Sequence, residues 1–213
     1  IMQNYEIATV IVIFGIIDKQ LNILLVKRSA EPENNKWALP GGLWIGENNL
    51  QETATDKLLL ETGAKDVYLE QLFTLSGLNL ENPKSLAVCY FALVNEKNVQ
   101  LRKEDAWHPK WFNANEMLDL AFQNDLVIER AINRIESKLE YSNVAYSLLP
   151  NEFTMRELQE TYEAITGKNY DRRNFRKRMI SNNLIQETGN LRKAGAHRPS
   201  SLYEFISKLP TIY

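Results

Sequence analysis

The chain has almost no cysteine. Its single cysteine, Cys89, lies in the apolar run LAVCYFALV. One thiol cannot form a disulfide within the chain, so we expect a protein suited to a reducing cytoplasm. Buried cysteine packs as a small hydrophobic residue, and Cys89 is therefore expected in the core of a strand rather than as a nucleophile.

A long hydrophobic segment is also missing. The longest apolar run, residues 7–17, has 11 residues, whereas a helix needs about 20 to span a bilayer. No lysine or arginine comes before Lys19, so this run lacks the positive flank of a secretory signal. We expect a cytoplasmic protein without a membrane partner.

Net charge is small as well. The 25 basic and 27 acidic residues give −2, which excludes a general attraction to nucleic acid. The charges are unevenly placed, however. Residues 168–198 contain nine Lys and Arg but only two acids, a net charge of +7, which leaves −9 for the rest of the chain. A basic C-terminal segment therefore follows an acidic body.

The first part of the chain is mostly strand-like. Two β-branched apolar runs, residues 7–17 and 21–28, are separated by a connection short enough for a hairpin. A second pair of strands is expected at 66–77 and 85–96, and a short strand at 106–112. The pattern predicts a strand-rich sandwich.

Two helices are expected to flank these strands. The first, residues 49–63, ends at a glycine. The second, residues 125–140, has one apolar face at helical spacing, formed by Ile128, Ile132, Ile135 and Leu139. Strands and helices together form a first domain of the α+β class over residues 1–145.

Residues 146–213 have the order of a winged helix-turn-helix domain. Thr154 and Glu157 form a capping box at the start of one helix, which Gly167 ends. Asp171 is the expected N-cap of the next helix. Two short strands follow, at 184–189 and 200–206, joined by a basic loop over 190–199.

That second helix carries Phe175 and Met179, which are expected to turn inward. The basic residues fall on this helix and on the loop, the two elements that a winged helix presents to DNA. A charge run on a solvated helix face is the alternative interpretation. The predicted DNA-binding residues are Arg172, Arg173, Asn174, Arg176, Lys177, Arg192, Lys193, His197 and Arg198.

Residues 42–64 resemble the Nudix box: glycine, five residues, glutamate, seven residues, then Arg-Glu-aliphatic-x-Glu-Glu-x-Gly-aliphatic. The matching positions are Gly42, Leu58, Glu61, Gly63 and Ala64, after the family-like entry LPGG. The departures are Asn48 for the first glutamate, Asp56 for the arginine, and Lys57 and Leu60 for two metal-binding glutamates.

These departures affect the metal site. In the family, glutamates spaced i, i+3 and i+4 share a helix face and bind Mg²⁺. Here Lys57 and Glu61 are four residues apart and are expected to pair, which puts a cation where the metal would sit. One remaining carboxylate does not make a tight Mg²⁺ site. We therefore predict no metal, no cofactor and no catalytic residue, and a protein that is not an enzyme.

Over nearly its full length the chain resembles the Nudix-related transcriptional regulators. The resemblance implies a Nudix-like α/β/α sandwich with a mixed sheet, followed by a winged helix-turn-helix. It also implies a repressor that binds palindromic operator DNA as a homodimer and senses a small molecule, either ADP-ribose or a related nucleotide sugar, or a sugar such as arabinose. By the same resemblance the effector-binding residues are Arg28, Trp37, Gly41, Gly42, Leu43 and Glu61. Trp37 could equally be core, and the glycines a turn.

Two other functions stay open. One is a Nudix-type hydrolase of a nucleoside-diphosphate derivative such as ADP-ribose, with an atypical metal site built from Glu47, Glu52 or Glu61. The other is a Nudix-like domain that binds no effector and only holds two chains together. The basic helix and loop favour the regulator over the hydrolase.

Overall fold

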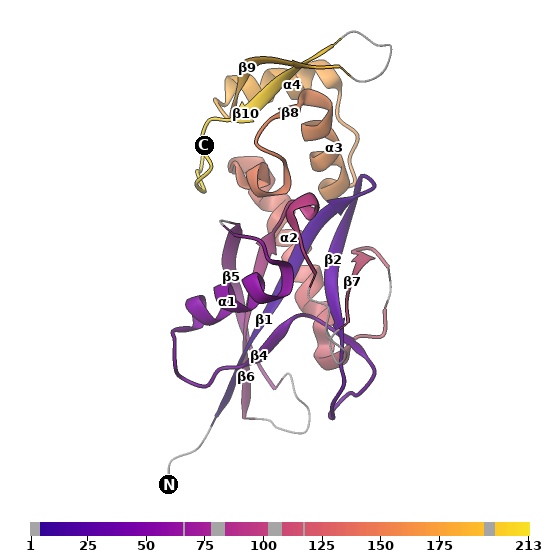
Figure 1. The fold of residues 1–213 in the computed structure, drawn as a ribbon, viewed down its shortest axis with the longest axis vertical. Helices are drawn as coiled ribbons and strands as arrows, with labels where there is room; N and C mark the ends of the chain where they lie inside the picture. Colours follow the sequence, from indigo (N-terminus) through magenta and orange to yellow (C-terminus); the bar gives the residue numbers. More distant parts are fainter. Residues whose placement is uncertain (1–4, 66, 78–83, 102–107, 117, 194–198) are drawn as a thin grey trace.

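The computed structural model describes residues 5–65, 67–77, 84–101, 108–116, 118–193 and 199–213. The chain forms a mixed sheet with two long helices and, at the other end of the molecule, a small helical domain with a hairpin (Figure 1). In the part of the chain that is described, no helix is long and apolar enough to cross a membrane.

One mixed sheet forms the larger half. Its strands are β1 (Glu6–Ile17), β2 (Gln20–Lys27), β3 (Trp37–Ala38), β4 (Gly41–Leu43), β5 (Tyr68–Ser76), β6 (Ser85–Leu93) and β7 (Pro109–Asn113). The expected hairpins β1–β2 and β5–β6 are antiparallel, and they join through parallel pairing of β1 with β6. β4 also pairs with β1, and β7 with β2. The predicted mixed sheet is confirmed.

Alternate side chains of β1 face two different layers. Ile11 and Ile13 pack with Ala54 and Leu58 of α1 (Leu50–Thr62) on one side of the sheet. Val10, Val12 and Phe14 pack with the second helix, α2 (Asn124–Tyr141), on the other. Because successive side chains of a strand point to opposite faces, a strand buried on both sides is apolar throughout. This arrangement is the expected α/β/α sandwich.

The helix ends follow their capping residues. Asn49 and Glu52 form a capping box at the start of α1, and Gly63, in the left-handed conformation, ends it. In α2, Ile135 and Leu139 are buried, while Ile132 of the same predicted face is only partly buried. Three short 3₁₀ turns complete this half: η1 (Glu96–Asn98), η2 (Ala121–Gln123) and η3 (Val144–Leu148).

The smaller half is a winged helix-turn-helix. Its elements are β8 (Phe153–Thr154), α3 (Met155–Thr166), α4 (Arg172–Ser181), β9 (Ile185–Arg192) and β10 (Ser200–Phe205), with the strands in the order β8-β10-β9. The capping box of Thr154 and Glu157 and the cap at Asp171 are present as predicted. Phe175 and Met179 of α4 are buried.

The prediction for the loop between the last two strands was wrong in one respect. β9 continues three residues beyond the predicted end and includes Arg192, which was expected in the loop. Arg192 is paired with Ser200 of β10 in the strand register, so the hairpin is longer and its loop shorter.

The two halves share one continuous core. Side chains of α2 and η3 belong to the same buried cluster as Leu158 and Tyr162 of α3. The chain after β10 also returns to the end of α2, where the buried side chain of Asn143 donates hydrogen bonds to the Ser207 and Leu209 carbonyls, at 2.8 and 2.9 Å. The winged helix therefore contacts α2 in two ways, through the shared core cluster and through the hydrogen bonds of Asn143 at the end of the helix.

Candidate functional site

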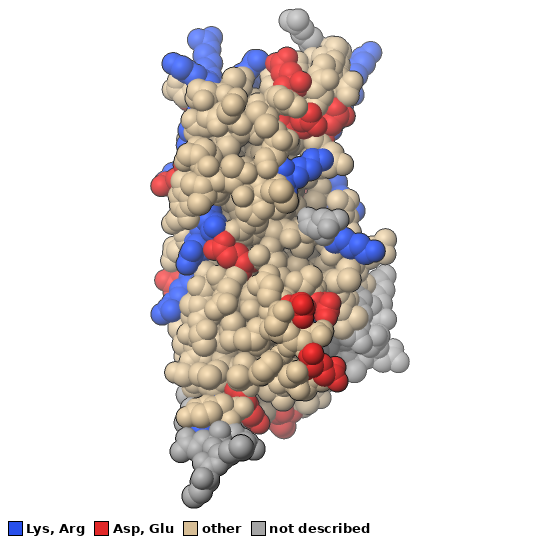
Figure 2. All heavy atoms as spheres, turned by 90° about the vertical axis from the view of Figure 1, so that its left-hand side faces the viewer, with Lys and Arg blue, Asp and Glu red and all other residues tan. Residues whose placement is uncertain are grey.

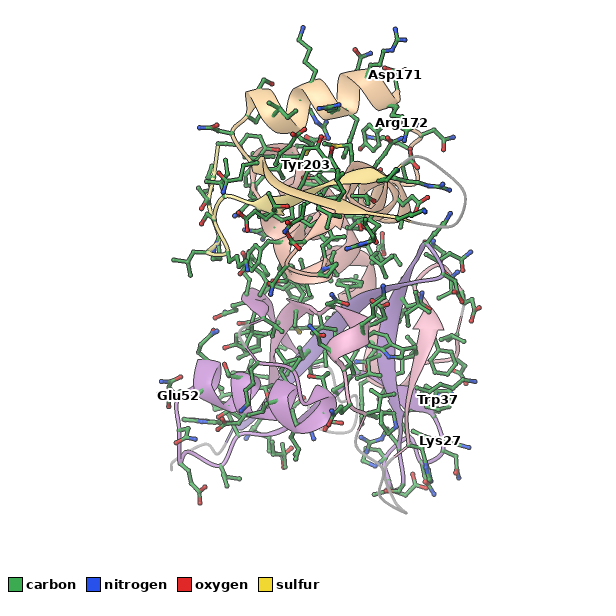
Figure 3. All side chains as sticks on the ribbon, turned by 45° about the horizontal axis from the view of Figure 1, so that its top comes forward. Lys27, Trp37, Glu52, Asp171, Arg172 and Tyr203 are labelled. Atoms are coloured by element: carbon green, nitrogen blue, oxygen red, sulfur yellow. The ribbon has the colours of Figure 1, made fainter. Side chains whose placement is uncertain are left out.

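An open cavity of about 570 Å³ lies at one end of the large sheet. It is bounded by the start of β1 and β6, the end of β2, all of β4, the 29–32 loop and Phe122. Lys27, one of its lining residues, lies at the end of the molecule opposite to α4, as Figure 3 shows. Four of the six predicted effector-binding residues line it: Arg28, Gly41, Gly42 and Leu43.

Arg28 organises the mouth of this cavity. Its Nε donates a hydrogen bond to the Pro32 carbonyl at 2.9 Å, and its guanidinium lies 4.4 Å from the centre of the Phe122 ring. Burial lowers the pKa of Arg28, while Glu33 and Glu31 act in the opposite direction. The group stays charged, since arginine loses its proton only at very high pH. Arg28 therefore joins the 29–32 loop to the aromatic wall through a cation–π contact.

Phe122 is a lining residue that sequence reasoning missed. Its backbone is left-handed, with a φ of 55°, and Gln123 follows at 53°. Left-handed non-glycine residues cost energy and gather at functional sites. The turn is held by the buried Asn124, whose side-chain oxygen accepts a hydrogen bond from the Leu39 backbone at 2.8 Å. No residue pattern in the sequence marks this turn in advance.

The two glycines of β4 differ in what they do. A Cβ on Gly41 would lie 2.4 Å from the Thr9 carbonyl oxygen, so only glycine allows β4 to approach β1 at this point. A Cβ on Gly42 would meet nothing within 4 Å. Gly41 therefore shapes the wall of the cavity, whereas Gly42 leaves space open beside it.

Two predicted effector residues lie elsewhere. Trp37 packs against Phe112 with 4.7 Å between the ring centres, and Glu61, in the last turn of α1, is fully buried. Neither belongs to the lining of the cavity. The expected contact of Trp37 and Glu61 with an effector therefore has no support from this cavity, because packing occupies one side chain and an ion pair the other.

The helix face that would hold a metal does not fit one. The Lys57 Nζ lies 2.9 Å from Glu61 Oε1, and Leu60 exposes 52% of its surface. Among the residues that the structure describes, no group of three or more His, Cys, Asp or Glu is close enough to hold a metal ion. The expected pairing of Lys57 with Glu61 is confirmed, and it places a lysine ammonium at the last carboxylate that matches the Nudix box.

α4 presents a basic face to solvent. Its inner side is fixed by Phe175 and Met179, and the predicted DNA-binding residues Arg172, Arg173, Asn174, Arg176 and Lys177 are all exposed. Figure 3 shows Asp171 and Arg172 at the outer end of the winged helix, and Figure 2 shows Lys and Arg side chains projecting from that end. The side chains of Arg172, Arg173 and Lys177 make no hydrogen bond or ion pair with any described residue, so their donors are available to phosphates or bases.

Three arginines of the basic segment are held by the protein itself. Arg192 makes two hydrogen bonds to the Glu157 carboxylate, at 2.8 and 3.0 Å, and one to the Glu152 carbonyl at 2.9 Å. Arg178 lies over the rings of Tyr162, Tyr170 and Phe175.

Arg176 is the third. Its guanidinium donates to the Glu187 carboxylate at 3.2 Å, and the Tyr203 hydroxyl donates to the same oxygen at 2.8 Å. The net charge of this segment therefore overstates the number of Lys and Arg side chains that are available to contact DNA. Lys193 is exposed, and the two remaining predicted contacts, His197 and Arg198, lie outside the described residues.

Comparisons with known proteins agree with this architecture. Residues 6–131 match the NUDIX domain family, and residues 145–205 match the NrtR DNA-binding winged helix domain. The chain is 39% identical over 199 residues to the ADPR responsive transcriptional repressor NtrR of Acinetobacter baylyi, covering 91% of this chain and 79% of that protein.

Two solved structures are also similar. One is Shewanella oneidensis NrtR complexed with a 27mer DNA, with a TM-score of 0.83, 32% identity, and 93% of each chain covered. The other is the NUDIX domain of the same NrtR complexed with ADP ribose, with a TM-score of 0.56 and 30% identity, covering 63% of this chain and 90% of that one. The first of these structures contains DNA, and the second, of the NUDIX domain alone, contains a small molecule.

Proposed function

Because the chain belongs to the NrtR family, in which a NUDIX domain is joined to a DNA-binding winged helix domain, we propose that it is a transcriptional repressor controlled by ADP-ribose. It binds operator DNA through α4 and the following hairpin, and the NUDIX domain binds the effector. The A. baylyi relative is named as ADPR responsive, and ADP ribose is bound to the NUDIX domain of S. oneidensis NrtR. These relatives favour ADP-ribose over a pentose.

The observation that carries this proposal is that the domain has lost the metal site but keeps an open cavity. A NUDIX domain that keeps an open pocket of about 570 Å³ but pairs Lys57 with its last matching glutamate can bind a ligand without the chemistry of hydrolysis. The cavity has groups that suit ADP-ribose: Lys27 and Arg28, which line it together with Glu6 and Glu31, supply positive charge for a diphosphate, and Phe122 supplies an aromatic ring.

The two alternative functions are each weakened by one of these features. A hydrolase needs ligands for its metal, and the positions that would provide them carry Lys57 and Leu60. A domain that only joined two chains would need no charged cavity. ADP-ribose binding followed by a change in DNA affinity is therefore the function that the site supports best.

The complete regulator is proposed to be a cytoplasmic homodimer. A single winged helix reads one half-site, and a two-fold dimer places two such helices about 34 Å apart or at a multiple of that distance, which matches a palindromic operator. The described part of each chain contains one winged helix-turn-helix, with one α4 and one β9–β10 hairpin. Light scattering of the free protein and of its DNA complex measures this directly, and two chains per complex are expected.

Titration of the protein onto its operator tests the function. The operator is first selected from a random duplex library, and its affinity is then measured by fluorescence anisotropy with and without ADP-ribose. We expect ADP-ribose to change operator affinity by about five-fold or more, the usual range of allosteric coupling, while arabinose and AMP do not. No selected duplex, or an affinity that ADP-ribose leaves unchanged, would contradict the proposal.

Chromatography of the same mixtures distinguishes the regulator hypothesis from the hydrolase hypothesis, because it shows whether ADP-ribose has been cleaved. The ADP-ribose in each titration should be recovered intact after incubation with Mg²⁺. Conversion of ADP-ribose at an ordinary enzymatic rate, on the order of 1 s⁻¹ or more, would favour the hydrolase instead.

A further inference from the structure

One ion pair joins α4 to the hairpin that follows it. Nη2 of Arg176, on α4, lies 3.2 Å from Oε1 of Glu187, on β9. The two side chains are 53% and 54% exposed. An exposed ion pair adds little to stability, because water and salt screen the charges and two long side chains must be held in one geometry. The conformation of Arg176 is therefore the more important consequence of this pair.

A buried hydroxyl fixes the carboxylate of the pair. Tyr203, on β10, is only 3% exposed, and its hydroxyl donates a hydrogen bond of 2.8 Å to the same Oε1 of Glu187. The two residues are partners in the strand register, so their side chains lie on the same face of the hairpin. Burial raises the pKa of Tyr203, so the hydroxyl keeps its proton and remains a donor. The orientation of Glu187 is thus set by the hairpin.

The Tyr203 ring also supports the arginine. The guanidinium carbon of Arg176 lies 5.9 Å from the centre of that ring, at the distance of a cation–π contact. The hydrogen bond to Glu187 uses one of the five guanidinium N–H donors, so donors remain for a ligand. Arg172, one helical turn earlier, lies on the same side of α4 and is exposed. Arg176 is therefore held in place and still presents donors to solvent.

A held arginine suits a base better than a phosphate. Arginine binds guanine through two parallel hydrogen bonds, to O6 and N7, which require a defined plane of the guanidinium. A side chain that is already ordered also loses less conformational freedom on binding. The negative charge of Glu187 weakens the attraction of this site for a phosphate, whereas the edge of a base is neutral. The neighbours of Arg176 thus favour base reading over a backbone contact.

We propose that Glu187 and Tyr203 are positioning residues for DNA recognition, which hold Arg176 in the orientation that reads a base, with guanine as the matching partner. They act through Arg176 and not through DNA contacts of their own. The inference rests on the proposed function, because it requires a specific operator. It adds to that function two residues that carry no positive charge.

Anisotropy titrations on operator and on a scrambled duplex test the inference. The measured quantity is the discrimination, which is the affinity for the operator divided by the affinity for the scrambled duplex. Arg176→Ala should lower the discrimination about ten-fold or more, as expected for one lost base contact. Tyr203→Phe and Glu187→Gln should each lower it about three-fold or more, because each removes a contact that holds Arg176.

The affinity for the scrambled duplex separates positioning from simple charge effects. Tyr203→Phe keeps the ring and the net charge, so its affinity for the scrambled duplex should equal that of the wild type. Glu187→Gln removes a negative charge, so its affinity should be equal or higher. In the Arg176→Ala background neither substitution should lower the discrimination further, since the residue through which they act is absent.

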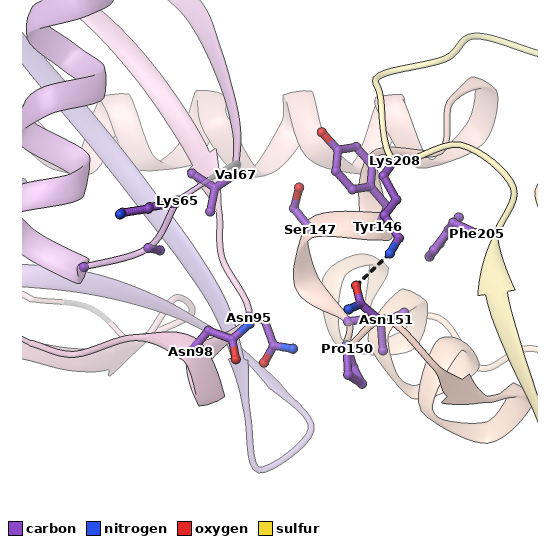
Figure 4. A pocket seen from close by; sticks show the side chains of 13 residues that line it. Lys65, Val67, Asn95, Asn98, Tyr146, Ser147, Pro150, Asn151, Phe205 and Lys208 are labelled. Carbon is purple, nitrogen blue, oxygen red and sulfur yellow. Dashed lines mark hydrogen bonds between the residues drawn. The ribbon is translucent and has the colours of Figure 1, made fainter.

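Two control variants change charge elsewhere in the winged helix. Glu204→Gln alters a carboxylate of β10 that accepts a hydrogen bond from Gln186 at 2.9 Å. Lys208→Ala removes a cation that donates to Asn151 at 2.8 Å, where the winged helix meets the NUDIX half (Figure 4). Both should keep the discrimination of the wild type. Melting curves without DNA verify that every variant is folded at the temperature of the titrations.

Three results would overturn the inference. One is wild-type discrimination in both Tyr203→Phe and Glu187→Gln, and the exposed Glu187 keeps this test valid if Tyr203→Phe does not fold. Another is an equal rise in affinity for both duplexes in Glu187→Gln, since Glu187 would then only compete with DNA for Arg176. The third is a further loss of discrimination in the Arg176→Ala background. A wild type that does not distinguish the duplexes would instead overturn the proposed function together with this inference.

Discussion

The ammonium of Lys57 lies 2.9 Å from the carboxylate of Glu61, one helical turn along α1. Glu61 is fully buried, so the pair is shielded from water and salt far more than a surface ion pair would be. A Mg²⁺ ion at this carboxylate would have to displace a bound lysine. Ligand binding by the NUDIX domain is therefore expected to be independent of metal.

Restoring acids at the two substituted positions tests that expectation. We expect a large excess of Mg²⁺, or a chelator, to leave the Tm of the wild type unchanged, because the described residues include no group of three or more His, Cys, Asp or Glu that could hold the ion. The double variant Lys57→Glu with Leu60→Glu should gain a Mg²⁺-dependent rise in Tm, since ligand binding to the native state raises stability. The control is Lys65→Glu with Leu59→Glu, which adds the same charges elsewhere. A wild type that is itself stabilised by Mg²⁺ would refute the argument.

Gly41 and Gly42 offer a second test, in which neighbouring residues receive the same change. Gly41→Ala places a methyl group 2.4 Å from the Thr9 carbonyl, which forces β4 away from β1, while Gly42→Ala points into open space. The first should cost about 1–3 kcal/mol, as over-packed sites do, and lower the Tm by a few degrees. The second should leave folding unchanged. Equal Tm values for the two variants would contradict the close approach of β4 to β1.

Local structure was largely predictable from the sequence because it depends on local chemistry. The predicted capping box at Thr154 satisfies backbone donors three residues away, and the predicted Gly63 and Gly167 supply the left-handed conformation that ends each helix. The capping box at Asn49 is of the same local kind but was not predicted. Sequence spacing is enough to identify such motifs. The inward side of α4 followed from the spacing of its two apolar residues.

Non-local features could not be predicted in the same way. The parallel pairing of β1 with β6 joins residues about 80 positions apart, and no side chain specifies it alone. The left-handed turn at Phe122 depends on Asn124 reaching Leu39. Arg192 looked like any other basic residue of the segment, because its partner Glu157 lies 35 positions earlier in the chain.

Stability should fall in alkaline solution. Burial raises the pKa of Cys89 to about 12 and raises the pKa of Tyr162 and Tyr68 above the ordinary phenol value, with a hydrogen bond to Glu70 adding to the effect at Tyr68. The folded state thus keeps these groups neutral, while the unfolded chain ionises them above about pH 9. The unfolded state then binds fewer protons than the native state, so stability decreases as pH rises. Urea unfolding at pH 7.5, 9 and 10.5, roughly, should show falling free energies, and constant values would contradict this.

The structure divides the arginines of the basic segment into two kinds, which gives the last prediction. Arg172 and Arg173 are exposed and unpaired within the described part of the chain, whereas Arg192 is fixed to Glu157 and to the Glu152 carbonyl. Alanine at Arg172 or Arg173 should weaken operator binding by about 1–3 kcal/mol without changing the Tm, and should relax sequence preference if the side chain reads a base. Alanine at Arg192 should lower the Tm because the Glu157 carboxylate and the Glu152 carbonyl lose the hydrogen bonds that Arg192 donates. Lys193→Ala should weaken binding to operator and scrambled duplexes alike and make the salt dependence shallower by about one unit.

Anisotropy titrations of each variant on operator and scrambled duplexes, at several salt concentrations, measure the effects on DNA binding, and melting curves measure the effects on Tm. Unchanged DNA affinity in the Arg172, Arg173 and Lys193 variants would mean that this basic face is only a solvated surface and does not bind DNA.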